Sequence, residues 1–192
     1  MTTPVEHAPR NFTDLTGRVA VLIGGTSGLG RAIAIGLGQA GADVVPAGRS
    51  AALVAETCEQ IRQSGRRTLE HCVDVVSRSS VDTLRDVVCA QLGGVDVLVN
   101  AAGRTARRPT AAVTTDEWVS VLETNLTGTL HTCQAFFPTL SRHGRGRIVN
   151  IASLSSFVAF HEVAAYGASK AAVLARPGIV VDGGFLASGV NS

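Results

Sequence analysis

The sequence predicts an α/β fold in which a doubly wound parallel sheet carries helices on both faces. Short, almost continuously apolar runs alternate with segments of helical periodicity, which is typical of parallel strands that are buried on both sides. Charged residues make up only 17% of the chain and glycine contributes 21 residues, as expected for buried strands joined by tight turns. A chain of 192 residues is long enough to form a single domain with its own core.

The expected strands and helices alternate along the chain. Strands are predicted at 18–23, 42–47, 67–73, 95–100, 147–152 and 178–182. Helices are predicted at 28–40, 51–64, 78–91, 115–140 and 163–175. Because Pro46 lacks the N–H that a central strand donates, the second strand is expected to end at Val45. Residues 1–15 are expected to form a flexible tail.

The composition argues against several classes of partner. The formal net charge is only +2, so the chain has no strongly basic face for nucleic acid or an anionic membrane surface. Residues 1–17 contain no apolar signal-peptide core, and no stretch approaches the ~20 apolar residues that span a bilayer. We therefore expect a small-molecule substrate, no nucleic acid, no membrane contact and a cytoplasmic location.

The cysteines and histidines do not show metal-ligand spacing. The 5 histidines are dispersed, and the 4 cysteines form no C-x-x-C pair. We interpret the cysteines as small buried hydrophobic residues and expect neither a metal site nor a disulfide. The cysteines are Cys58, Cys72, Cys89 and Cys133.

The stretch "VLIGGTSGLGRAIA" contains a glycine turn between the first expected strand and the first expected helix. Gly24 would permit the turn, Gly28 would let a phosphate approach the backbone, and Gly30 would allow the helix to pack closely on the strand. A pyrophosphate would then meet the free N–H groups of the helix N-terminus. A plain tight turn is the alternative. The same site includes Thr26, Ser27 and Leu29.

The end of the second expected strand bears on the choice of cofactor. Gly48 and Arg49 stand where a ribose-binding carboxylate would select NAD. A guanidinium can bind a 2′-phosphate through two hydrogen bonds, so NADP is favoured and NAD is the alternative. A surface arginine that simply leads into the next helix would also explain Arg49.

Tyr166 is the only tyrosine and Lys170 the only lysine in the chain, and they are four residues apart on an expected helix. Side chains at this spacing share one helix face. An ammonium ~5 Å from a phenolate stabilises it by about 3 kcal/mol at an effective dielectric near 20, which would prepare Tyr166 for acid–base chemistry. An accidental surface pair is the alternative.

The chain resembles the short-chain dehydrogenase/reductase family. The glycine turn is followed, in the family's order, by "CVDV" at 72–75, "NAAG" at 100–103, "TNLTG" at 124–128, "GRIVNIAS" at 146–153 and "YGASK" at 166–170. The resemblance implies one dinucleotide-binding Rossmann domain over residues 1–192. It also implies an NAD(P)-dependent oxidoreductase that moves hydride between a nicotinamide and a carbonyl or secondary alcohol.

The resemblance also implies roles for four residues. Tyr166 would donate or accept the proton, and Ser153 would hydrogen-bond the reacting oxygen. Lys170 would stabilise the phenolate and bind the cofactor ribose, while Asn125 would hold a water that relays protons. Ser153 also follows an apolar strand, where open α/β sheets bind ligands, although a serine at that position often only forms a turn.

Further cofactor contacts are implied at the ends of the next strands. Asp74 and Val75 would line the adenine pocket, and Asn100 and Ala101 would begin the motif that closes the sheet beside the cofactor. Ile23 replaces the threonine that the family usually has before its first glycine, which removes one stabilising hydroxyl.

The stretch "GRTARRPT" suggests a class of substrate. Its arginines, Arg104, Arg107 and Arg108, follow the fourth expected strand and could bind a carboxylate. This loop and the ending "VDGGFLASGV" are similar to those of gluconate and deoxygluconate dehydrogenases in the family. A solvated loop is the alternative.

The family resemblance is interrupted after Ala175. The chain passes directly through "RPG" into "IVVDGG", whereas the family completes a long helix, a strand and a substrate lid first. An internal deletion near the C-terminus would remove the lid, and a shortened interface helix would weaken any homo-oligomer. The alternatives to an active enzyme are therefore a cofactor-binding relic with little turnover and a truncated product that folds poorly.

Overall fold

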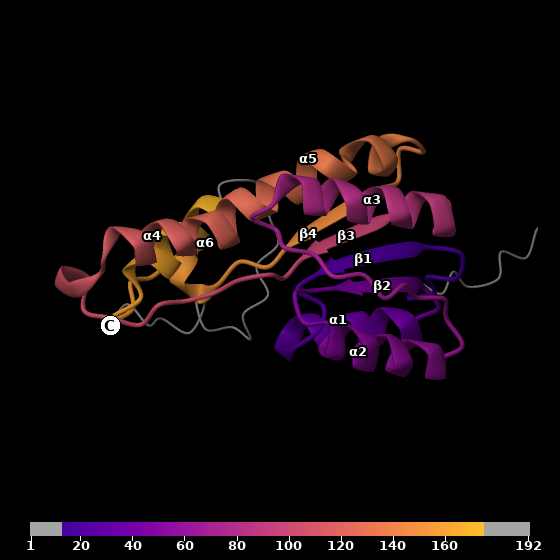
Figure 1. Cartoon of the computed structure of the whole chain (residues 1–192), viewed down its shortest axis with the longest axis horizontal. Coiled ribbons are helices and arrows are strands. Elements are labelled where there is room, and N and C mark those ends of the chain that lie inside the picture. The colour runs from indigo at the N-terminus through magenta and orange to yellow at the C-terminus, as the bar shows by residue number, and fades with distance from the viewer. Residues whose placement is uncertain (1–12, 175–192) are drawn as a thin grey trace, which may run out of the picture.

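The computed structural model describes residues 13–174 as a parallel sheet between two layers of helices (Figure 1). The sheet has the strand order β2-β1-β3-β4, and every pair is parallel. Its strands are β1 (Val19–Ile23), β2 (Asp43–Ala47), β3 (Val97–Asn100) and β4 (Arg147–Asn150). The helices are α1 (Gly28–Gln39), α2 (Ala51–Gln63), α3 (Arg78–Leu92), α4 (Thr115–Leu122), α5 (Gly128–Ser141) and α6 (Ala164–Leu174). The predicted doubly wound α/β class is confirmed.

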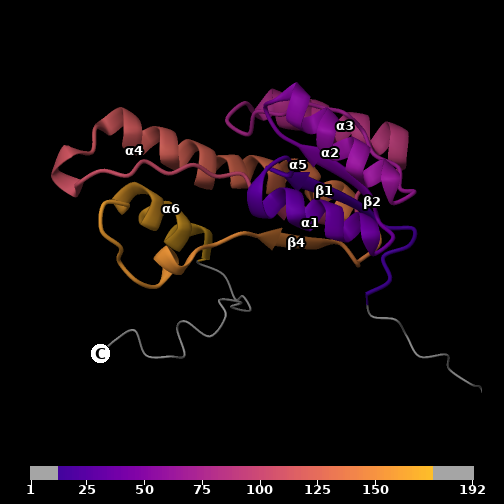
Figure 2. The same cartoon turned by 90° about the horizontal axis from the view of Figure 1, so that it is seen from below.

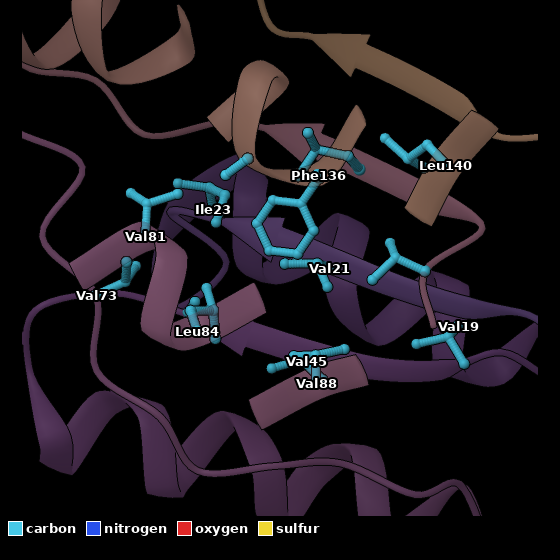
Figure 3. Packing of buried hydrophobic residues seen from close by; sticks show 14 of the residues in the cluster. Val19, Val21, Ile23, Val45, Val73, Val81, Leu84, Val88, Phe136 and Leu140 are labelled. Carbon is cyan, nitrogen blue, oxygen red and sulfur yellow. The ribbon is translucent and has the colours of Figure 1, made fainter. Parts of the chain in front are cut away.

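Alternate residues of the central strand feed two separate cores. Val21 points to the face covered by α3 and α5, where the fully buried Phe136 packs close to it (Figure 3). Leu22 points to the opposite face, which α1 and α2 cover through Ala34 and Ile61. Both faces of β1 are therefore buried, which explains its uninterrupted apolar sequence.

The predicted end of the second strand at Val45 is wrong, because β2 continues through Pro46 to Ala47. Asp43 donates its N–H to Arg18 of the chain beside β1, whereas Val44 donates on the other side. Pro46 shares the orientation of Val44, so its missing N–H lies on the side away from β1. A proline there removes no bond between β1 and β2.

The prediction of a regular strand at 67–73 is also wrong. The segment runs beside β2, but it pairs as a strand only through the single bridge between Gly48 and Cys72. Hydrogen bonds join it to β2 near its two ends, from Val44 N to Arg67 O and from Val73 N to Gly48 O. Between them, Pro46 offers no donor, which accounts for the interruption.

The helix predicted at 115–140 is divided by a π-helical segment, Glu123–Thr127. α4 begins with a capping box in which Thr114 and Glu117 exchange side-chain and backbone hydrogen bonds. The π-helical segment then continues without a break into α5. α6, predicted at 163–175, packs against α4 beyond the end of the sheet to which the strand arrows point (Figure 2).

Two further predictions concern segments that lie wholly or mostly outside the described residues. The strand expected at 178–182 and most of the expected tail lie outside residues 13–174. Within that range no helix is long and apolar enough to cross a membrane. The four cysteines form no disulfide among the described residues, but only Cys58 is buried and Cys72 is exposed, so their common interpretation as buried residues is wrong.

Candidate active site

A cleft of about 340 Å³ opens at the carboxyl ends of the strands. The β1–α1 turn, the end of β2 and the segments that follow residue 73 and β3 form its walls. Open α/β sheets bind ligands at this edge. The lining includes most of the predicted cofactor residues: Gly24, Thr26, Ser27, Leu29, Gly30, Arg49, Asp74, Val75 and Ala101. The lining also includes Ala102, Gly103, Arg104, Thr124 and Ile151, which the sequence reasoning did not assign to cofactor binding.

Two positions of the glycine turn, Gly24 and Gly30, have no room for a side chain. Gly24 has a φ of 79°, and a Cβ atom there would lie 2.5 Å from the backbone nitrogen of Ala102. Gly30 packs so closely that a Cβ atom would overlap the carbonyl oxygen of Gly24. Gly28 has a φ of 49° and faces open space. The turn therefore combines close packing at Gly24 and Gly30 with an accessible backbone at Gly28.

The N-terminus of α1 points an unpaired set of amides toward this turn. Ser27 is its N-cap residue, and the Ser27 side chain makes no capping hydrogen bond. The first turn of α1 contains no acidic residue. Free N–H groups and the positive end of a helix dipole suit an anionic group such as a pyrophosphate. These features fit a dinucleotide.

The end of the cleft beside β2 presents one cation and one carboxylate. Arg49 is exposed and lines the cleft, and no ion pair engages it within residues 13–174. Ser50 is the N-cap of α2, where its hydroxyl accepts a hydrogen bond from Leu53 N. Asp74 is also exposed, and its carboxylate accepts from Val76 N at 3.1 Å.

Asn100 is buried and connects the two strands and the helix that close the sheet. Its Nδ2 donates to Oδ1 of Asn150 on β4 at 2.9 Å. Its Oδ1 accepts from the hydroxyl of Thr132 on α5 at 2.7 Å. The side chain is therefore directed into the fold, while the following residue, Ala101, lines the cleft.

Asn125 lies in the π-helical segment with only 1% of its surface exposed. Its Oδ1 accepts from Arg104 N at 2.8 Å, and its Nδ2 donates to Arg104 O at 3.0 Å and to Ser169 Oγ at 2.9 Å. Its main-chain carbonyl accepts from Thr129 Oγ1 at 2.8 Å. Single π turns inside helices are common at functional sites, because they change the direction in which side chains point.

Lys170 is buried at the end of the cleft, with an exposed fraction of 5%. Its Nζ donates to the carbonyl of Ile151 at 2.6 Å and lies 5.9 Å from the centroid of the Tyr166 ring. A Cβ atom at Gly103 would lie 3.7 Å from this ammonium and 3.5 Å from Asn125 Oδ1. The structure thus brings Asn125 and Lys170 together around Gly103, with the Tyr166 ring beside the ammonium.

Burial lowers the pKa of Lys170 below its ordinary value, because desolvation disfavours the charged ammonium. Within the described residues, the ammonium contacts one backbone carbonyl and one aromatic ring, and neither carries a full negative charge. An anion formed beside this lysine would therefore be attracted in a site with little water.

Ser153 lies at the turn after β4 and serves there as an N-cap. Its Oγ accepts from Ser155 N at 3.2 Å and begins the short 3₁₀ turn Leu154–Ser156. No hydrogen bond joins Ser153 Oγ to the Tyr166 hydroxyl within residues 13–174. The turn-forming role is therefore observed, and it leaves the hydroxyl proton of Ser153 free to donate.

The three loop arginines are not equivalent. Arg108 forms an ion pair with Glu117 at 2.5 Å. Arg104 lines the cleft, and its guanidinium donates to Ser120 Oγ at 2.5 Å. Arg107 is exposed, and no ion pair holds it in the part of the chain that the structure describes. Among the described residues, Arg104 and Arg107 therefore form no ion pair with a carboxylate, whereas Arg108 does.

Three contacts around Lys170 and Asn125 were not predicted from the sequence. The carbonyl of Ile151 binds Lys170, Gly103 leaves room for the ammonium, and Ser169 binds Asn125. Gly103 and Ser169 stand inside the quoted motifs "NAAG" and "YGASK", which was the available signal. A backbone carbonyl such as that of Ile151 leaves no signal in a sequence.

A glycine turn, an uncapped helix N-terminus and a strand-end cleft define a dinucleotide-binding α/β protein. The sequence profile of the short chain dehydrogenase family matches residues 18–175. The chain therefore belongs to the short-chain dehydrogenase family of oxidoreductases, and the resemblance stated from the motifs is confirmed.

Curated relatives and solved structures agree with this assignment. An uncharacterized oxidoreductase from Staphylococcus aureus is 37% identical over 162 residues, which are 84% of this chain and 69% of the relative. Another from Staphylococcus epidermidis is 34% identical and covers 85% of this chain and 74% of the relative. A gluconate 5-dehydrogenase from Burkholderia cenocepacia, solved in complex with NADP and tartrate, has a TM-score of 0.79 and 34% identity. That match covers 84% of this chain but 63% of the dehydrogenase, so this chain spans less than two thirds of its length.

The glycine turn generates a paired stability prediction. Gly30→Ala should lower the free energy of unfolding by roughly 1–3 kcal/mol, because its methyl group would overlap the Gly24 carbonyl. Gly36→Ala, on the exposed side of the same helix and with open space around it, should raise that free energy by roughly 0.5–1 kcal/mol. Urea unfolding measures both. Equal effects of the two substitutions would contradict the packing argument.

The lowered pKa of Lys170 predicts a pH-dependent contribution to stability. Below the ordinary lysine pKa of 10.5, the unfolded chain binds more protons than the folded chain, so stability rises with pH. The free energy of unfolding of the wild type, minus that of Lys170→Met, should therefore increase from the lowered pKa toward pH 10.5 and level off above it. Urea unfolding of both proteins across this range measures the difference. A difference that does not change with pH would show that the ammonium is not desolvated.

Proposed function

We propose that this chain is an NADP-dependent oxidoreductase that transfers hydride between the nicotinamide and a carbonyl or secondary alcohol. The observation that carries the proposal is the meeting of Tyr166, Lys170 and Asn125 at one end of the nucleotide cleft. Because the chain spans under two thirds of the solved dehydrogenase, its activity as a whole is inferred from these residues and from the family.

The residues of the cleft fit the parts of the cofactor. The open backbone at Gly28 and the free amides of α1 would bind the pyrophosphate, and Asp74 and Val75 would contact the adenine. Arg49, with Ser50 beside it, would bind a 2′-phosphate. Lys170 would donate hydrogen bonds to the ribose next to the nicotinamide.

When bound, NADPH supplies a hydride to the carbonyl carbon of the substrate. Tyr166 donates its phenolic proton to the substrate oxygen as the new C–H bond forms, which yields the alcohol. The ammonium of Lys170 stabilises the phenolate that remains, and Ser153 donates a hydrogen bond to the same substrate oxygen. The Asn125 carbonyl has a second lone pair beyond its bond to Thr129, which can hold a water that returns the proton.

A sugar acid is the proposed class of substrate. Arg104 lines the cleft and Arg107 is not paired with a carboxylate, so both could bind a substrate carboxylate. The gluconate 5-dehydrogenase that resembles this chain was solved with tartrate, a hydroxy acid. Arg108 is excluded from this role by its ion pair with Glu117.

A cofactor-binding relic is the second candidate. The observation that favours it is the short span of the chain relative to the solved dehydrogenase, together with the sequence interruption after Ala175. Without a lid, water would enter the site, and contacts that hold the substrate for reaction would be lost. Nucleotide binding would then survive without turnover.

Turnover by Tyr166 is tested with NADPH and a panel of keto sugar acids. Tyr166→Phe should lower kcat at least ~100-fold, since it removes the proton donor, and should change the Kd for NADPH less than ~3-fold. Absorbance of NADPH measures oxidation, and its fluorescence measures binding. Oxidation that survives in Tyr166→Phe would reject the mechanism, and tight binding without oxidation by the wild type would support the relic.

Cofactor choice is tested at Arg49. Arg49→Ala should weaken NADPH binding by roughly 10–100-fold, through loss of charge-assisted hydrogen bonds, and should leave NADH binding nearly unchanged. Arg142→Ala removes an exposed arginine away from this cleft and serves as the control. Equal affinities of the wild type for NADPH and NADH would reject the preference for NADP.

A further inference from the structure

Ser169 connects two parts of the catalytic end of the cleft. It is fully buried on α6, with an exposed fraction of 0%. Its hydroxyl donates to the carbonyl of Tyr166 at 2.7 Å and accepts from Nδ2 of Asn125 at 2.9 Å. One hydroxyl therefore joins the helix that carries Tyr166 and Lys170 to the π-helical segment.

The other bonds of Asn125 extend this connection to the wall of the cleft. Its side chain binds both the N–H and the carbonyl of Arg104, directly after Gly103. Together with the bond to Ser169, these contacts use both Nδ2 hydrogens and the Oδ1 atom. The side chain of Asn125 is thus a fixed link, because each of its polar atoms already has a partner.

The position requires a small group that donates and accepts at the same time. The Tyr166 carbonyl accepts the Ser169 hydroxyl proton in addition to its bond within α6, and the Asn125 amide needs an acceptor. A serine hydroxyl satisfies both, alanine satisfies neither, and a cysteine thiol does so weakly. In the fully buried surroundings of Ser169, water cannot readily replace the hydroxyl.

We infer that Ser169 is a positioning residue that acts through Asn125. Its hydroxyl fixes the distance between α6 and the loop at Gly103 and Arg104, and so holds Tyr166 and Lys170 against the cleft. The inference rests on the proposed function for its effect on turnover, but the link itself does not depend on turnover.

The first experiment measures the link without any reaction. Amide hydrogen exchange at Arg104 reports the bond from its N–H to Asn125 Oδ1. Ser169→Ala should speed this exchange roughly tenfold, because Asn125 loses one of its bonds. Thr57→Val is the matched control, since it removes another buried helical hydroxyl that bonds the carbonyl four residues earlier, on α2 and away from the site. Unchanged exchange at Arg104 in Ser169→Ala would overturn the inference.

The second experiment uses turnover. Ser169→Ala should lower kcat roughly tenfold, with the Kd for NADPH changed less than ~2-fold, and Ser169→Cys should fall between it and the wild type. Because Ser169 is proposed to act through Asn125, a variant with both Ser169→Ala and Asn125→Ala should be no slower than Asn125→Ala alone. Full additivity of the two losses, or a lower melting temperature with unchanged kcat, would overturn the inference.

The outcomes separate the two proposals. A wild type that oxidises no NADPH rejects the proposed function, while the exchange at Arg104 still decides whether Ser169 holds Asn125. An active wild type with unaltered Ser169→Ala supports the proposed function and rejects the positioning role. If Ser169→Ala does not fold, Ser169→Cys provides the same comparison with a side chain of similar shape.

Discussion

The geometry of the site depends on one buried cation. Lys170 is the only lysine of the chain, and its ammonium binds the carbonyl of Ile151 directly after β4. This bond places α6 at the carboxyl edge of the sheet, where the nucleotide cleft opens. The same ammonium lies over the ring of Tyr166. A charge held out of water favours any arrangement that brings an anion to it, so this ammonium would attract the phenolate that the proposed proton transfer creates.

The two ends of the cleft are built by different means. At the glycine turn, the wall is formed by backbone, since Gly24 packs on Ala102 and Gly30 packs on Gly24 so closely that no side chain fits. At the end near Lys170, buried polar side chains hydrogen-bond one another, with Asn125 and Ser169 at the centre. Glycine packing leaves room for an anion, whereas the polar network fixes the orientation of reacting groups.

The sequence predicted the order of the elements well, because burial on both faces leaves uninterrupted apolar strands and a short glycine turn has few conformations. The predictions from the sequence failed where the local backbone structure depended on hydrogen bonds between neighbouring segments. Pro46 was expected to end its strand, yet its missing donor lies on the side where no regular strand pairs. The π turn at Asn125 arises from tertiary bonds to residue 104 and α6, which helical periodicity cannot reveal. Most of the residues predicted to bind the cofactor line the cleft, but Arg108 could not be distinguished from Arg104 without its ion pair to Glu117.

The buried polar network of residues 13–174 is complete in itself. No buried side-chain nitrogen or oxygen in that range lacks a hydrogen-bond partner. Asn100 is satisfied by β4 and α5, Asn125 by residue 104 and Ser169, and Lys170 by Ile151. The groups proposed for proton transfer therefore take their positions from contacts within this range.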